Sequence, residues 1–499
     1  MRVKHGDGVR AALTLAAILL ELTVAAALLI FLGARAAPVY AALQALSGIA
    51  LLCLMGESEK GAYRSAWMGC TLVLGPAGVA LYLLFGRRNG SALARLSAEN
   101  MDRAQQLLCG RGRESDASDT PGVHYLYARG FPIYAAGECR YLPTGEAFLA
   151  ALLEDIAQAR ERVELEFFII SKGKILDDLL KICTQAHERG VVIRLLIDDA
   201  GTLLRKDADL RRRIAQAGIE LRVFNPIARH APLLTLNFRD HRKIAVIDGR
   251  VAYTGGVNIA DEYANLFTRH GYWKDTGVRL SGESAVSFGA FFEALWAAAD
   301  AQRLDRLPAM PTVRCEGSGL AQPYQSGPLS AGRSCASGLQ RLLITGARRR
   351  VWIATPYLLL DETMESALCL AAQSGVDVRL LLPGVPDHRS VELAGEAHYP
   401  ALLRSGVRLY RYMPGFVHAK MCVCDDTVCI GTVNLDFRSL YLHFEDGVLL
   451  RDTPAAADIC RDMEEMMQKS EQIALKELEN AAPLQRMARA ILRALAPLL

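Results

Sequence analysis

The sequence lacks an excess of charge of either sign. Its 57 lysine and arginine residues stand against 54 aspartate and glutamate residues, so the formal net charge is only +3 across 499 residues. A protein whose main task is to coat nucleic acid needs a broad basic surface. The balanced charge therefore argues against a nucleic acid partner.

The sequence also lacks a metal-binding cysteine pattern. Its twelve cysteines are scattered, and the closest pair, Cys422 and Cys424, has no second pair of cysteines or histidines nearby to complete a zinc site. We interpret the cysteines as small buried apolar side chains in a reducing compartment. No nucleotide-binding loop is visible, and we expect neither a metal nor a cofactor.

Long apolar runs, in contrast, are present near the N-terminus. Residues 11–32 are long enough to span a bilayer, which takes about 20 apolar residues, and residues 38–55 and 67–85 are further apolar runs. No small-residue cleavage site stands out, so we do not expect a cleaved signal peptide. Residues 1–88 are therefore predicted to form a membrane anchor of two or three helices.

The number and direction of these spans stay open. Glu21 lies in the middle of the first run, and Gly75 and Pro76 can break the third. Basic side chains lie on both sides of the segment, and an odd number of spans cannot place both sides in the cytoplasm. We favour a cytoplasmic position for the second group, which leads into the large soluble part. The basic residues are Arg2, Lys4 and Arg10 before the segment and Arg87 and Arg88 after it.

Residues 89–135 are polar and predict a linker, and alternating helix-like and strand-like stretches follow it. Similar units recur at offsets of 185 to 188 residues, which predicts a duplicated α/β domain. The fold class is therefore α/β, with two pseudo-symmetric domains at 136–310 and 311–499, each a mixed sheet flanked by helices. The recurring units are ARERV at 159 with ARRRV at 347, Gly190 with Gly375, and Gly218 with Gly406.

The two halves differ just before the first reactive stretch. Residues 226–238 (PIARHAPLLTLNF) contain most of an extra stretch of 11 residues that the second half does not have. Such an insertion is either a lid or acyl-chain-binding loop, or a tolerated surface insertion. The sequence leaves both interpretations open.

One pattern, HxKxxxxD, occurs in both halves. Residues 241–248 read HRKIAVID, and residues 418–425 read HAKMCVCD. Side chains two apart on a strand point to one face, so the His and Lys of each copy are expected to project together. Pseudo-symmetric packing would then bring both pairs into one cleft, where lysines attract an anion and imidazoles supply a nucleophile and an acid. The pairs are His241 with Lys243 and His418 with Lys420.

Each copy is followed by a tight turn, a second strand and an asparagine. Asp248 and Asp425 stand at the turns, and we expect them to hold the hairpins rather than to contact a substrate. Asn258 and Asn434 end the second strands. A single His on a strand is usually a satisfied core residue. Two copies in equivalent places favour a site that attacks a phosphodiester without a metal.

These two stretches resemble the signature of the phospholipase D superfamily. The surrounding residues are similar, more narrowly, to bacterial cardiolipin synthases from about residue 140 to the C-terminus. The stretches that carry the resemblance include TGGVNIADEY, GYWKDT, TPY at 355–357 and GTVNLDFRSLYLHFE. The resemblance implies a multi-pass protein of the bacterial inner membrane, with its catalytic domains in the cytoplasm and phospholipids as substrates.

The resemblance further implies a phosphatidyl-transferase with two chemical steps. His241 would attack the phosphorus of phosphatidylglycerol and form a phosphatidyl-histidine, while His418 would protonate the departing glycerol. His418 would then deprotonate a second phosphatidylglycerol, which displaces the enzyme and gives cardiolipin. Pseudo-symmetry alone does not order the two histidines. The residues expected to hold phosphate oxygens are Lys243, Lys420, Asn258 and Asn434.

A nucleophilic histidine needs an orienting partner on its other ring nitrogen. Glu445 stands where the superfamily places such a carboxylate, and Asp275 in GYWKDT is the expected counterpart in the first half. The sequence departs from the family at His443, where Asn is usual, and at Leu358 and Leu359, where Phe and Pro are usual. These departures leave the substrate details open.

Other functions remain open at this stage. A phospholipase D hydrolase would use water as the acceptor, and a phosphatidylserine synthase would use another donor and acceptor. A nuclease would share the reactive set, but the apolar N-terminus and balanced charge disfavour it, and a non-enzymatic scaffold would not need both His–Lys pairs. The C-terminal arginines at 486, 489 and 493 share a helical face that either contacts an anionic membrane or packs on the core.

Overall fold

The computed structural model describes nine stretches of the chain: residues 37–56, 61–83, 92–112, 120–202, 207–227, 238–308, 319–329, 334–479 and 483–496. The apolar run 11–32 and the basic residues on both sides of the predicted anchor lie outside these residues, as does most of the insertion 226–238. The chain divides into two compact units, residues 1–89 with 494–499, and residues 90–493.

The smaller unit contains three described helices, α2 (Ala37–Gly56), α3 (Gly61–Leu74) and α4 (Pro76–Leu81). The predicted break in the third apolar run is present, because Gly75 has a φ of 54° and separates α3 from α4. Trp67 and Tyr82 pack edge to face with their ring centroids 5.6 Å apart. Among the described residues, no helix has both the length and the apolar character needed to cross a membrane.

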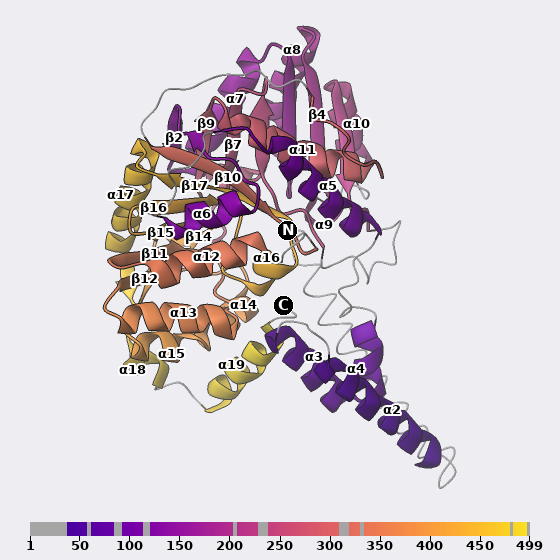
Figure 1. The fold of residues 1–499 in the computed structure, drawn as a ribbon, viewed down its shortest axis with the longest axis vertical. Helices are drawn as coiled ribbons and strands as arrows, with labels where there is room; N and C mark the ends of the chain where they lie inside the picture. Colours follow the sequence, from indigo (N-terminus) through magenta and orange to yellow (C-terminus); the bar gives the residue numbers. More distant parts are fainter. Residues whose placement is uncertain are drawn as a thin grey trace. The chain divides into compact units, whose positions relative to one another are not determined.

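The larger unit contains two mixed sheets, as predicted (Figure 1). The first has seven strands, with three neighbours at one edge parallel and the others antiparallel. In spatial order they are β2 (Cys139–Leu142), β9 (Gly277–Ser281), β7 (Val251–Gly255), β6 (Ile244–Ile247), β3 (Arg162–Phe167), β4 (Val192–Asp198) and β5 (Ile219–Phe224).

The second sheet repeats this seven-strand pattern and adds a short strand at each edge. As in the first sheet, three neighbouring strands are parallel, and they lie beside the antiparallel hairpin that begins just after the HxK residues. In spatial order the strands are β1 (Tyr134–Ala135), β10 (Leu320–Ser326), β17 (Glu445–Arg451), β16 (Thr427–Gly431), β15 (Met421–Cys424), β11 (Arg350–Ala354), β12 (Asp377–Pro383), β13 (Arg408–Tyr412) and β18 (Ser470–Gln472).

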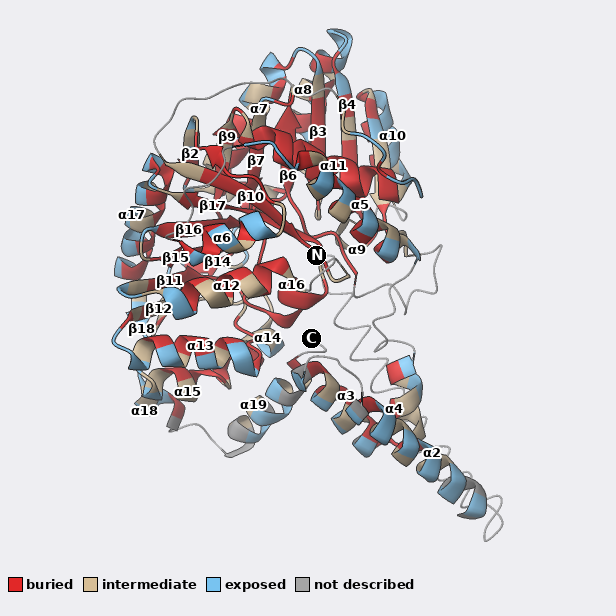
Figure 2. Ribbon diagram, viewed as in Figure 1, coloured by how far each residue is buried: buried red, intermediate tan, exposed pale blue. Residues whose placement is uncertain are grey.

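Helices cover both sheets. The central strands are almost wholly buried, whereas outer strands such as β5 and β18 are partly exposed (Figure 2). In the first half these helices are α7 (Gly145–Gln158), α8 (Lys174–Glu188), α9 (Asp199–Thr202), α10 (Ala208–Gln216) and α11 (Ser284–Ala299). In the second half they are α12 (Cys335–Gly346), α13 (Glu362–Gln373), α14 (Arg389–Glu396), α15 (Tyr399–Arg404), α16 (Phe437–Tyr441), α17 (Pro454–Gln468), α18 (Leu475–Glu479) and α19 (Pro483–Leu495).

Two helices link the halves. Helix α11 is apolar on all sides and buried along its length, as a helix enclosed by other elements must be. It packs on the first sheet and also on β10 of the second, and α17 makes the reciprocal contact with β2. The stretch predicted as a linker contributes α5 (Ala92–Leu108), which packs on α11, and α6 (Pro121–Ala128), which packs on α12.

The basic face of α19 contacts the core of the larger unit. Arg489 forms an ion pair with Glu396 at 2.5 Å, and Arg493 pairs with Glu365 at 3.0 Å. Of the two open interpretations of this helix, the arrangement agrees with packing on the core.

A buried ion pair lies between the two sheets. The Arg242 side chain is fully buried, and its Nε donates to Glu166 at 2.6 Å. Its two terminal nitrogens donate to Gln325 of β10 and to the backbone oxygen of Phe291 in α11, each at 3.0 Å. One guanidinium therefore donates hydrogen bonds to groups from both halves of the chain.

We expect Arg242→Met to destabilise the fold strongly, since it leaves the buried Glu166 carboxylate without its cation. The free energy of unfolding should fall by about 3–5 kcal/mol, measured as a lower urea midpoint for the full chain in micelles. The matched control is Arg212→Met, which removes an exposed pair with Asp209 and should cost less than about 1 kcal/mol. Equal effects of the two changes would contradict this account.

Candidate active site

The two predicted histidines occupy equivalent places in the two sheets. His241 precedes β6 by three residues and His418 precedes β15 by three, although the strands themselves begin after each HxK stretch rather than within it. The backbone N–H of His241 donates to Phe444 at 2.9 Å, and that of His418 donates to Lys274 at 2.8 Å. Each reactive segment is therefore held by backbone bonds to the opposite half.

The second of these contacts is built as a small sheet. Strand β14 (Gly415–Val417) runs parallel to β8 (Tyr272–Lys274) immediately before His418. The first contact is a single parallel bridge between Asp240 and Phe444. The two connections are related by the same pseudo-symmetry as the sheets.

Each histidine is bonded to a carboxylate from the other half. Both carboxylate oxygens of Glu445 lie 3.0 Å from Nδ1 of His241, and Asp275 Oδ2 lies 2.5 Å from Nδ1 of His418. Both carboxylates are fully buried. The bonds fix the orientation of the rings and leave each Nε2 free for chemistry. The sequence predicted both carboxylates but did not show that the pairs cross between the halves.

A glycine makes room for one of these carboxylates. A Cβ placed on Gly256 would lie 2.0 Å from Oδ1 of Asp275, far inside the contact distance. The other Asp275 oxygen is the one bonded to His418, and Oδ1 accepts the backbone N–H of Thr276 at 2.8 Å. Gly256, directly after β7, is therefore needed for the carboxylate to reach the histidine.

Two buried lysines complete the set of cationic groups. Lys243 Nζ donates to the backbone oxygen of its own His241 at 2.7 Å, and Lys420 makes the same bond to His418. Burial lowers the pKa of Lys243 to about 8 and that of Lys420 to about 7. Glu445 and Asp275 favour the charged form of each ammonium. The carboxylates thus keep both lysines available for an anion.

The histidines are neutral at ordinary pH. Burial lowers the pKa of His241 and of His418 well below the usual value, and the charges of Lys243 and Lys420 lower both pKa values further. Burial also raises the pKa of Asp275 to about 7. A neutral imidazole offers a lone pair, and a bound anion would restore its tendency to take up a proton.

The aspartates of the two HxKxxxxD stretches lie at the hairpin turns. Asp248 accepts the backbone N–H groups of residues 160–162 at 2.8 to 3.3 Å, and Asp425 accepts those of residues 348–350 at 2.8 to 3.0 Å. Both have a φ of 52°, in the left-handed region that tight turns require. Each therefore fastens its hairpin to the start of β3 or β11.

The two asparagines bond to neighbouring groups rather than to the reactive set. Asn258 accepts the backbone N–H of Ile169 at 3.0 Å and donates to the hydroxyl of Tyr263 at 2.7 Å. Asn434 donates to Asp436 at 3.0 Å, and its Oδ1 has no partner in the described part of the chain. Within the described residues, neither asparagine is hydrogen-bonded to a reactive His or Lys.

Sequence reasoning missed two supporting groups. Thr432 donates its hydroxyl to Glu445 at 2.5 Å, and Asp446 accepts the hydroxyl of Thr254 at 2.5 Å. Burial raises the pKa of Asp446 to about 7. The Gly-Thr pair before Asn434 was the available signal for Thr432, whereas nothing local indicated that Asp446 lies beside Lys243.

Aromatic rings surround the histidines unequally. Phe168 packs edge to face on His241 at 5.2 Å between centroids. The His418 ring instead contacts Tyr263 and Trp273, each at 5.4 Å, and Phe416 at 5.9 Å. The two sides of the site are therefore chemically distinct despite the symmetric backbone.

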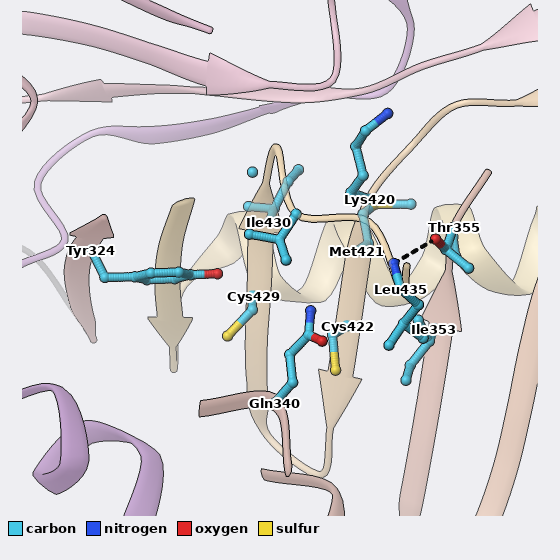
Figure 3. A pocket seen from close by; sticks show the side chains of 13 residues that line it. Tyr324, Gln340, Ile353, Thr355, Lys420, Met421, Cys422, Cys429, Ile430 and Leu435 are labelled. Atoms are coloured by element: carbon cyan, nitrogen blue, oxygen red, sulfur yellow. Dashed lines mark hydrogen bonds between the residues drawn. The ribbon is translucent and has the colours of Figure 1, made fainter. Parts of the chain in front are cut away.

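A small cavity lies behind one of the lysines, between β11, β15, β16 and α12. Figure 3 shows Lys420 pointing away from Gln340, Cys422 and Cys429, which line the other end. The lining is mostly apolar, so the ammonium turns out of it toward the reactive groups. The sulfurs of Cys422 and Cys424 lie 3.6 Å apart, and every cysteine in the described residues is a free thiol.

The buried lysines predict that anion binding weakens as the pH rises. Sulfate keeps its charge across this range, whereas Lys420 and Lys243 lose their protons near pH 7 and pH 8. We expect sulfate affinity, measured by calorimetry, to fall on the order of tenfold between pH 6.5 and 8.5. Lys420→Arg keeps its charge and should flatten this dependence. An affinity that stays constant or rises with pH would contradict the assignment.

Comparison with known proteins identifies both halves of the chain that carry the HxKxxxxD stretches. A family model described as "Cardiolipin synthase, PLD-like domain" matches residues 152–268 and 341–467. The solved phosphatidylserine synthase of Haemophilus influenzae superposes with a TM-score of 0.57 at 16% identity, covering 76% of this chain and 96% of that one. At this identity the likeness shows the fold alone.

Relatives among curated sequences are more similar to this chain. An uncharacterised protein of Streptococcus mutans is 36% identical over 393 residues, 78% of this chain and 84% of that one. The cardiolipin synthase of Geobacillus kaustophilus is 32% identical over 457 residues, 89% of this chain and 90% of that one. Cardiolipin synthase 2 of Bacillus anthracis is 33% identical over 367 residues, 72% and 71% of the two chains. The chain belongs to the cardiolipin synthase family of phospholipase D-like proteins.

Proposed function

We propose that this protein is a cardiolipin synthase, which transfers a phosphatidyl group from one phosphatidylglycerol to another. The observation that carries the proposal is the crossed arrangement of the site. Two neutral imidazoles each have Nδ1 bonded to a carboxylate of the opposite half, beside two buried lysines. This set provides a nucleophile, an acid and a cationic cradle for one phosphodiester.

In the first step, Nε2 of His241 attacks the phosphorus of phosphatidylglycerol. Binding of the phosphate anion raises the pKa of His418, which takes up a proton from solvent. A P–N bond then forms as the bond from phosphorus to the glycerol oxygen breaks, and the protonated His418 gives its proton to that oxygen. Glu445 stabilises the positive charge that develops on His241. The ammonium groups of Lys243 and Lys420 leave their backbone acceptors and bind the phosphate oxygens.

In the second step, the headgroup hydroxyl of another phosphatidylglycerol attacks the phosphatidyl-histidine. His418 takes the hydroxyl proton, the new P–O bond forms and the P–N bond breaks. His241 returns to its neutral form, and the products are cardiolipin and glycerol. The assignment of His241 as the nucleophile follows the family resemblance, and the different aromatic surroundings of the two histidines agree with unequal roles.

Two further roles belong to this proposal. Asn258 and Asn434 lie at the ends of the hairpins and would turn their amides toward phosphate oxygens once substrate displaces their present partners. The apolar N-terminal segments would hold the protein at the bacterial inner membrane, with residues 136–310 and 311–499 as catalytic domains on the cytoplasmic side. Such an anchor would give the site access to both lipid substrates.

The direct test uses purified full-length protein and labelled phosphatidylglycerol in mixed micelles. We expect release of glycerol and formation of a lipid with four acyl chains, identified by mass spectrometry. Formation of phosphatidic acid alone would replace the proposal with a hydrolase, in which water is the acceptor. A product only when serine and a CDP-activated lipid donor are both added would replace it with a phosphatidylserine synthase.

The paired mechanism also predicts the effect of removing either imidazole. His241→Ala and His418→Ala should each lower the rate by at least about a thousandfold, because each removes a group from both chemical steps. His124→Ala is the matched control, since His124 is exposed on α6. Substantial activity in either active-site variant would refute the pairing.

A further inference from the structure

A third imidazole lies beside the nucleophilic histidine. The ring centroids of His443 and His241 are 5.5 Å apart, and His443 Nδ1 lies 3.7 Å from Oε1 of Glu445. That distance is too long for a hydrogen bond. The His443 side chain is only 11% exposed, and neither ring nitrogen has a hydrogen-bond partner in the described part of the chain. Buried polar atoms normally have a hydrogen-bond partner, so these two nitrogens are available to a group from outside the chain.

The donor atoms around His443 form a recognisable set. One ligand atom from each of His241, His443 and Glu445 lies within 4.8 Å of the others. Two imidazoles, a carboxylate and an open fourth position make up a common zinc-binding set. Metal–ligand bonds of that type place the ligand atoms about 3.2–3.6 Å apart. Oε1 of Glu445 lies 3.0 Å from Nδ1 of His241 and 3.7 Å from Nδ1 of His443. Small side-chain movements would bring the three ligand atoms to the separations that a bound cation requires.

We propose that His241, His443 and Glu445 bind a zinc-type divalent cation that inhibits the enzyme. Imidazole-rich sites bind Zn²⁺ and Cu²⁺ in preference to Mg²⁺, which requires oxygen ligands. The ammonium groups of Lys243 and Lys420 oppose a further cation, so the affinity is below that of a structural zinc site. Binding itself does not depend on the reaction, whereas inhibition rests on the proposed function.

The inhibition follows from the proton on the His241 ring. A neutral imidazole carries one proton, which lies on Nδ1 when that nitrogen donates to Glu445. A cation bound at Nδ1 takes the place of this proton, which moves through solvent to Nε2. The lone pair of Nε2 is then used by the proton, and no atom of the ring remains to attack phosphorus. Removal of the cation by a chelator reverses the change.

The test compares the wild type with His443→Asn, the residue usual at this position in the family. Chelator-treated full-length proteins are titrated with ZnCl₂ against a zinc-binding dye, and product formation is measured at the same concentrations. We expect the wild type to bind one Zn²⁺ that the variant binds at least about tenfold more weakly. Inhibition, expressed relative to each protein's own rate in chelator, should weaken by a similar factor.

Controls separate this site from other zinc ligands. His124→Asn removes an exposed imidazole, and this variant should bind zinc and be inhibited by it as the wild type is. MgCl₂ should not inhibit the wild type. Equal zinc binding by wild type and His443→Asn would overturn the inference, as would tight binding that leaves the rate unchanged. Loss of zinc binding in His443→Asn without any lipid product from the wild type would keep the cation site and reject the proposed function.

Discussion

The structure depends on the exchange of carboxylates between its two halves. The site buries two histidines and two lysines within one small region, and burial of so many groups that can carry positive charge is unfavourable without anions. Glu445 from the second half and Asp275 from the first supply that compensation by bonding to the histidine of the opposite half. Neither half therefore contains a complete site, and the parallel contacts that precede each histidine align both pairs at once.

The sequence predicted the elements of the site because their signals are local. The HxK spacing, the hairpin turn after it and the recurrence at a near-constant offset are each visible within a short window. The fold class and the two mixed sheets followed from the same periodicity. The crossing of His241 to Glu445 was not predictable, since it depends on how two sheets nearly 200 residues apart in sequence face each other. The predicted domain bounds stay a prediction.

Other features depended on groups that the sequence did not place together. His443 was visible as a departure from the family, but only its distance from His241 and Glu445 gives it chemical meaning. Arg242 stands between His241 and Lys243 in the sequence, and its side chain points away from theirs. There it forms hydrogen bonds with Glu166 of the first sheet and Gln325 of the second. In the N-terminal segment, Gly75 and Pro76 divide the third apolar run into two helices, a break for which the backbone chemistry of these two residues is sufficient.

The proposed mechanism requires that His241 forms a covalent intermediate that His418 resolves. It is tested most directly by quenching a His418→Asn variant at alkaline pH after incubation with short-chain phosphatidylglycerol, followed by proteolysis and mass spectrometry. We expect a phosphatidyl group on the peptide that contains His241, and no such adduct when the His241→Ala change is introduced as well. An adduct on any other residue, or turnover by the wild type without an adduct on His241, would contradict it.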